Sequence, residues 1–66
     1  MGIEIKKESH MAFYIYKDSQ HYWRWRLKAA NNRIIADSGE GYLHKADCLS
    51  AITLVKSSSS APVYEV

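Results

Sequence analysis

Aromatic and basic side chains alternate with apolar ones along two neighbouring segments of the sequence. Residues 11–17 carry tyrosines on one side of the alternation, and residues 22–29 carry cations there. The set consists of Tyr14, Tyr16, Tyr22, Arg24, Arg26 and Lys28. Because tyrosine rings stack on nucleic-acid bases and guanidinium groups contact phosphates, one chemistry open to this set is the binding of single-stranded nucleic acid.

The same residues have a structural interpretation, which we favour. Cations and tyrosine rings on one exposed sheet face brace one another through cation–π and cross-strand contacts. Nucleic-acid binding is kept as the alternative, because the glycine-rich aromatic signature of known RNA-binding sheets is missing. The net charge of +2 is also too small to imply a nucleic acid or an anionic membrane by itself.

Other residues with catalytic or ligating chemistry lack the neighbours that such chemistry needs. His10, His21 and His44 are spaced without the close Cys/His pairs of a structural zinc site. Asp37 and Glu40 lie three residues apart across a turn, but no nucleophile or ligand set accompanies them. The sequence therefore predicts no catalytic residue, no metal site, no cofactor and no enzymatic activity.

Three further features have ordinary structural interpretations. Trp23 and Trp25 are two residues apart on an apolar side, which is typical of core residues rather than of a ligand pocket. The glycines of residues 39–41 precede a helix, but the lysine and glycine spacing of a phosphate loop is missing, so we predict a plain turn. Cys48 falls on the apolar face of that helix and is predicted to be a buried, unreactive thiol.

The elements that position these residues follow from the hydrophobic period. Alternation predicts strands over residues 11–17, 22–29 and 33–38, and apolar residues at helical spacing predict an amphipathic helix over residues 45–57. A proline then favours an extended start to a fourth strand over residues 63–66. The predicted fold is a two-layer α+β unit of order β-β-β-α-β, in which one helix packs on an antiparallel sheet.

The turn between the second and third strands fixes the register of that hairpin. Asn31 and Asn32 tolerate a positive φ, which favours a two-residue turn. The residues then expected to face each other are Ala30 with Arg33, Leu27 with Ala36, and Arg26 with Asp37.

The core is predicted where the apolar sides of the two layers meet. The sheet is expected to contribute Phe13, Ile15, Trp23, Trp25, Leu27, Ile34 and Ala36. From the helix come Cys48, Leu49, Ile52 and Val55.

A chain of 66 residues has a small core, worth about 3–5 kcal/mol unless a disulfide, a metal or a partner chain adds to it. Cys48 is the only cysteine, which excludes an intrachain disulfide and is typical of a reducing compartment. We therefore expect a homodimer in which the last strand joins another chain's sheet, with residues 57–60 as the linker. The candidate dimer strand contains Pro62, Val63, Tyr64 and Val66.

The chain resembles the YegP-like family of small uncharacterised prokaryotic proteins in five stretches: YIYKD, WRWRLKAAN, IIADSGEGY, KADCLSAI and SAPVYEV. This resemblance covers residues 12–66. It implies a β-β-β-α-β unit that occurs as tandem repeats or as two subunits, which form one sheet and exchange carboxyl-terminal strands. One unit is present here, so the resemblance implies the homodimer; it implies no activity and no catalytic residue.

The domain organisation expected from the sequence is simple. Residues 1–10 are predicted to form a flexible, charged leader, and residues 11–66 a single YegP-like domain. Neither an apolar run of about eighteen residues nor a signal peptide is recognisable. We therefore expect a cytoplasmic, non-enzymatic interaction module without membrane contact, whose partners are a second copy of the chain and an unidentified protein.

Overall fold

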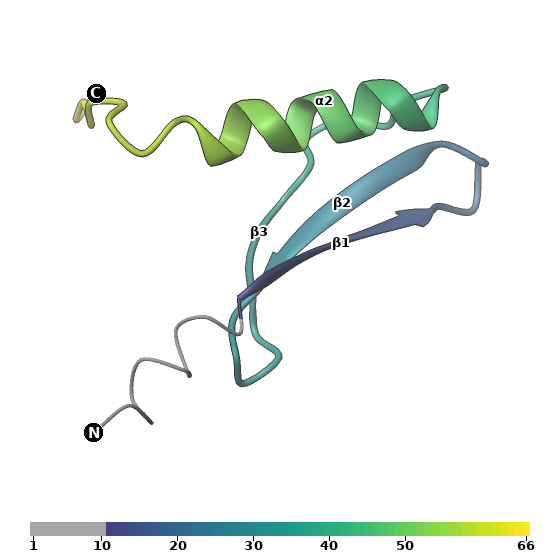
Figure 1. The fold of residues 1–66 in the computed structure, drawn as a ribbon, viewed down its shortest axis with the longest axis horizontal. Coiled ribbons are helices and arrows are strands. Elements are labelled where there is room, and N and C mark those ends of the chain that lie inside the picture. The colour runs from purple at the N-terminus through teal and green to yellow at the C-terminus, as the bar shows by residue number, and fades with distance from the viewer. Residues whose placement is uncertain (1–10) are drawn as a thin grey trace.

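Residues 11–66 are described by the structure, which is a computed structural model. They form three strands and one helix: β1 (Ala12–Lys17), β2 (Trp23–Lys28), β3 (Ile34–Asp37) and α2 (Lys45–Lys56) (Figure 1). The strands make one antiparallel sheet in the order β1-β2-β3, so each strand pairs with the next one in the chain. This arrangement confirms the predicted α+β class, and each observed element lies within its predicted range.

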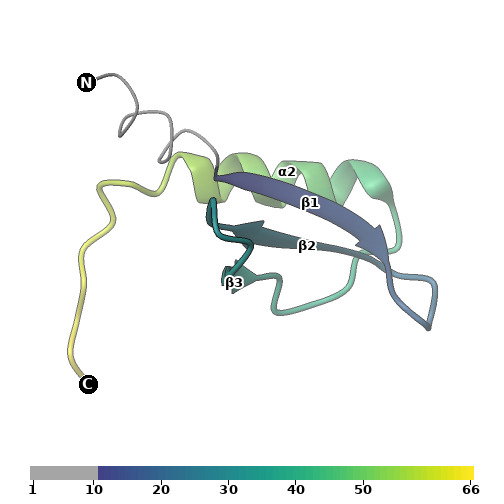
Figure 2. The same ribbon diagram turned by 90° about the horizontal axis from the view of Figure 1, so that it is seen from below.

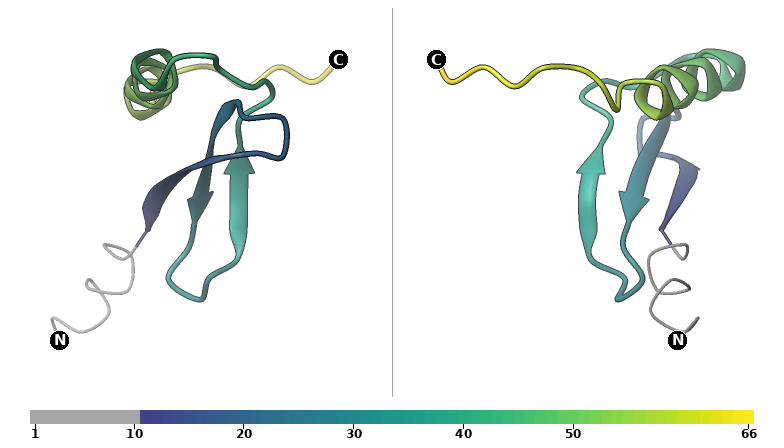
Figure 3. Two further views of the ribbon diagram at one scale, coloured as in Figure 1. Left: turned by 90° about the vertical axis from the view of Figure 1, so that its right-hand side faces the viewer. Right: turned by 60° about the vertical axis from the view of Figure 1, so that its left-hand side comes forward.

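Helix α2 covers one face of the sheet and leaves the other face open (Figures 2 and 3). The buried centre between the layers consists of Trp25 from β2 with Cys48 and Ile52 from α2. The ring of Phe13 meets the indole of Trp25 edge-on, with centroids 5.6 Å apart and an interplanar angle of 68°. A shell of half-buried apolar residues surrounds this centre: Phe13, Ile15, Trp23, Leu27, Ala36, Tyr42, Ala51 and Val55.

Two residues predicted for the core lie at the surface instead. Ile34 is 52% exposed and Leu49 is 45% exposed. Leu49 lies on the flank of the helix, whereas Ile34 is displaced by an irregularity of the sheet. The half-buried ring of Tyr42, which sequence reasoning did not place in the core, packs there because residues 23 and 42 form a β-bridge beyond β3.

The hairpin between β2 and β3 contains the irregularity. The predicted pairs of Leu27 with Ala36 and of Arg26 with Asp37 are confirmed, but Ala30 does not face Arg33. The amide of Ala29 donates to the carbonyl of Arg33 at 2.9 Å, which leaves a three-residue loop. Asn32 adopts a φ of 71° in that loop, and the register shifts by a bulge between Leu27 and Lys28. A type I turn followed by a left-handed residue is the usual geometry of such loops.

The helix begins without a side-chain cap. His44 is the N-cap residue in extended conformation, and its side chain accepts no hydrogen bond from the first turn. Asp47 in the first turn and Lys56 in the last turn both interact favourably with the helix dipole. Within residues 11–66 no helix is long and apolar enough to cross a membrane.

The predicted fourth strand does not form within the described residues of the single chain, and its pairing with a second chain stays a prediction. Residues 63–66 are extended away from the helix and pair with no strand of the sheet (Figures 1 and 3). Within residues 11–66 no backbone hydrogen bond joins these residues to the three-stranded sheet. The prediction of a flexible leader over residues 1–10 lies outside the described residues.

Candidate functional site

The open face of the sheet brings together the six residues singled out by the sequence. In the β1–β2 register Tyr14 faces Arg26 and Tyr16 faces Arg24. Strand side chains alternate between the two faces, and the alternate residues pack under α2, so these four side chains point away from the helix. We call this surface the aromatic–basic face; it contains Tyr14, Tyr16, Tyr22, Arg24, Arg26 and Lys28.

Cations lie over tyrosine rings on this face. The guanidinium carbon of Arg26 is 4.5 Å from the ring centroid of Tyr16, and the Lys28 ammonium is 5.4 Å from that of Tyr14. Each such contact contributes roughly 0.5–1 kcal/mol at an exposed site. The contacts of the bracing interpretation are therefore present, while the ring of Tyr14 still leaves half of its surface to solvent.

The third cation, Arg24, has a different partner that sequence reasoning missed. Its Nε donates to Oδ2 of Asp18 at 2.7 Å, forming an ion pair at the β1–β2 turn. Oδ1 of Asp18 accepts the backbone N–H groups of Gln20 and Tyr22, and His21 takes a φ of 69° to close the turn. A clue was present in the sequence, since aspartate at a turn often accepts backbone amides two residues on.

These contacts shift the acid–base behaviour of the pair. The hydrogen bond from Arg24, followed by that from the Tyr22 amide, holds the pKa of Asp18 below its ordinary value of 3.8. Reciprocally, the Asp18 carboxylate raises the pKa of Arg24 above its ordinary value. The turn is thus most stable when Asp18 is ionised.

We expect a pH-dependent loss of stability at this turn. A lowered pKa in the folded state means that ionised Asp18 stabilises the fold above pH ~4, and that this contribution is lost as the pH falls through the folded-state pKa. In thermal melts followed by circular dichroism, Asp18→Asn should melt below the wild type at pH 7, and the gap should close towards pH 2. Asp37→Asn is the matched control, because the Asp37 carboxylate makes no hydrogen bond or ion pair within residues 11–66. A gap that stays constant with pH would contradict the assigned role of Asp18.

At one end of the aromatic–basic face, Tyr22 and Arg24 pack closely against Gly41 in the loop after β3. A Cβ atom placed on Gly41 would lie 2.6 Å from Cβ of Tyr22 and 3.5 Å from an Nη atom of Arg24. The backbone on both sides is fixed by reciprocal hydrogen bonds between Trp23 and Tyr42, at 2.7 and 2.8 Å. The glycine at position 41 is therefore required for close approach.

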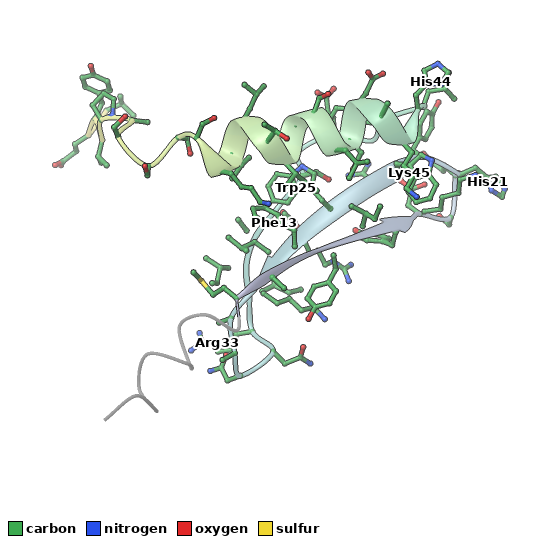
Figure 4. The ribbon with its side chains drawn as sticks, viewed as in Figure 1. Phe13, His21, Trp25, Arg33, His44 and Lys45 are labelled. Atoms are coloured by element: carbon green, nitrogen blue, oxygen red, sulfur yellow. The ribbon has the colours of Figure 1, made fainter. Side chains whose placement is uncertain are left out.

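The other candidate residues, a cysteine and two tryptophans, lie in or beside the core and have structural roles. Cys48 is fully buried, as predicted, and burial raises the pKa of its thiol. Trp25 is in the core, whereas Trp23 is half-buried with the ammonium groups of Lys17 and Lys45 at 5.4 and 5.5 Å from its ring centroid. Figure 4 shows Phe13 and Trp25 between the sheet and α2.

The histidines do not form a ligand set among the described residues. His21 and His44 lie near the same end of the molecule, with Lys45 beside them, while Arg33 lies at the opposite end (Figure 4). Across residues 11–66, no group of three or more His, Cys, Asp or Glu side chains is placed to hold a metal ion. His10 lies outside these residues.

The candidate dimer strand is largely exposed to solvent. Val63 is 94% exposed and Tyr64 is 78% exposed, and the side chain of Val66 has no cover at all. Residues 57–60, the predicted linker, form turns at the end of the helix in which the Ser57 and Ser58 hydroxyls donate to helix carbonyls.

Comparison with known proteins places this architecture among uncharacterised prokaryotic relatives. Residues 18–65 match the family described as "Domain of unknown function (DUF1508)". A "UPF0339 protein" of Neisseria meningitidis serogroup B is 56% identical over 57 residues, covering 85% of this chain and all of that protein. A "UPF0339 protein" of Treponema denticola is 51% identical over 55 residues, covering 82% of this chain and 93% of that protein.

The fold is also found in an experimental structure. The NMR solution structure of a protein from Haloferax volcanii matches with a TM-score of 0.79 and 38% sequence identity. The match covers 85% of this chain and 95% of the other.

Proposed function

Since this chain belongs to the DUF1508 family, whose described relatives have no assigned activity, we propose that it is a small, non-enzymatic interaction module that acts as a homodimer. The observation that carries the proposal is the exposed segment after α2. Among the described residues, its apolar side chains Val63, Tyr64 and Val66 are left largely exposed. Burying each such side chain would contribute about 1.5–3 kcal/mol.

The sheet offers a place for this segment. In the order β1-β2-β3 the outer edges of β1 and β3 have unpaired backbone groups, and such edges readily accept a further strand. Beside β3, the side chains of Ile34 and Ile35 are 52% and 53% exposed. We propose that the partner's residues 62–66 pair at this edge and cover these isoleucines, which satisfies the backbone of both chains.

The resemblance to the YegP-like family supports the same assembly. That resemblance implies two units joined through exchanged carboxyl-terminal strands, and this chain contributes one unit. A cytoplasmic location completes the proposal, because a single buried thiol at Cys48 suits a reducing compartment.

Sedimentation equilibrium at micromolar concentration tests the homodimer. We expect twice the chain mass of 7.6 kDa, and a monomer of lower melting temperature after deletion of residues 61–66. Val63→Asp should weaken the dimer, whereas Ser59→Asp, which adds the same charge to the polar part of the segment, should not. A mass of one chain for the wild type, or an unchanged mass and melting temperature after the deletion, would refute the proposal.

A further inference from the structure

The cations of the aromatic–basic face differ in their partners, which are a carboxylate for one and tyrosine rings for the other two. Arg24 is bound to the Asp18 carboxylate, which is the only ion pair among the described residues. Arg26 and Lys28 have no carboxylate partner within residues 11–66 and lie over tyrosine rings instead. Nε of Arg26 is buried without a hydrogen-bond partner, so packing rather than an ion pair holds its guanidinium in place. Two positive charges are therefore available to an anion on this face.

The charge around these two cations favours a negative ligand. Residues 22–33 contain four cations and no acidic residue. Asp37, the cross-strand neighbour of Arg26, is the nearest acid in the register, and it forms no ion pair with it. A ligand phosphate would therefore meet Arg26 and Lys28 without displacing an existing salt bridge.

The tyrosines of the face provide exposed aromatic surfaces for stacking. Tyr14 is 52% exposed and Tyr22 is 40% exposed. An unpaired base can turn its face to such a ring, whereas the bases of a duplex are already stacked on one another. The exposed rings therefore favour a flexible single strand over a duplex.

From this arrangement we propose that the aromatic–basic face binds single-stranded nucleic acid. Bases stack on the exposed side of Tyr14 and beside the Tyr16–Arg26 pair, and phosphates contact Arg26 and Lys28. Such binding requires no base-specific hydrogen bonds and tolerates any sequence. The inference deepens the proposed role as an interaction module by naming the class of partner, and it does not depend on the homodimer.

Fluorescence anisotropy with fluorescein-labelled oligo(dT) and oligo(rU) of twelve nucleotides tests this site. Binding should weaken as salt rises, with a slope of about −0.7 per phosphate contacted. R26Q/K28Q should reduce the size of that slope by about 1.4. The matched control is K17Q/K45Q, which removes two cations from the Trp23 ring and should leave the slope nearly unchanged.

Two single substitutions probe the stacking surface and the neighbouring charge. Tyr14→Thr keeps a strand-forming residue and should weaken binding by about fivefold or more, since base stacking contributes about 1–3 kcal/mol per base. Asp37→Asn should strengthen binding, because it removes the one carboxylate beside Arg26.

Melting curves and sedimentation of every variant establish that fold and assembly are retained, so a failure of the homodimer proposal is distinguished from a failure of this one. If R26Q/K28Q does not fold, the other two variants test the proposal: Tyr14→Thr must weaken binding and Asp37→Asn must strengthen it.

Three outcomes would overturn the inference. The first is binding no tighter than millimolar at low salt with both oligonucleotides. The second is an equal loss of binding in K17Q/K45Q, which would indicate attraction by net charge alone. Equal competition by duplex DNA is the third, since duplex bases are stacked on one another and cannot lie on the tyrosine rings.

Discussion

Replacing Ile52 by alanine is expected to lower the free energy of unfolding by about 2–5 kcal/mol. Within residues 11–66, Ile52 is one of three buried apolar residues, with Trp25 and Cys48, at the contact between α2 and the sheet. Because this buried centre is so small, few neighbouring side chains can move into the cavity that the substitution leaves. Because a core of this size contributes only about 3–5 kcal/mol, the variant should be largely unfolded at 25 °C. Far-UV circular dichroism with urea and thermal unfolding measures the change.

The matched control lies two residues further along the same helix. Leu54 is 72% exposed, so Leu54→Ala removes a similar volume from the solvent side and should change stability by no more than about 0.5 kcal/mol. Equal destabilisation by the two substitutions would mean that the helix does not dock through the Ile52 side.

Gly41→Ala is expected to destabilise the fold by about 1–3 kcal/mol. The added methyl group would lie 2.6 Å from Cβ of Tyr22 and 3.2 Å from its Cγ, and the Cβ atom is fixed by the backbone, so no side-chain rotation removes the closer contact. Relief requires the loop or the start of β2 to move, which strains the reciprocal hydrogen bonds between Trp23 and Tyr42. The melting temperature should fall by about 4–8 °C per kcal/mol in a domain of this size.

Gly39→Ala should have the opposite effect. No atom lies within 4 Å of a Cβ at position 39, and neither glycine has a positive φ. The alanine then restricts only the unfolded chain and should stabilise the protein by about 0.4–1 kcal/mol. If both variants shift the melting temperature in the same direction, contact with Tyr22 is not the reason for glycine at position 41.

Local patterns predicted the elements and most of the sheet register. Alternation along residues 22–29 placed Trp25 and Leu27 towards the helix, and the register partners Ala36 and Asp37 followed from counting through the turn. Counting alone could not show that the loop has three residues instead of two, or that a bulge next to Leu27 shifts the register by one residue. The longer loop and the bulge offset each other, so the predicted partners of Leu27 and Arg26 are correct, but Ile34 is left exposed.

The candidate face was predictable as a set of residues, but its internal partners were not. Period-two alternation is enough to place Tyr14, Tyr16 and Arg26 on one face. The partner of Arg24 depends on how the β1–β2 turn closes, and Asp18 reaches it in a turn in which His21 adopts a left-handed conformation. The predicted fourth strand stays a prediction, because its expected partner is a second chain and residues 63–66 pair with none of the three strands that the structure describes.

The order of the strands has a consequence for the rate of folding. Because β1, β2 and β3 pair in chain order, both strand pairings close over short turns, and short closures cost little chain entropy. Sheet formation should therefore be fast and independent of protein concentration. Exchange of residues 62–66 between two chains is a second-order reaction and would follow at a rate set by concentration, so a dilute refolding chain would spend time as a folded sheet with its last segment unpaired.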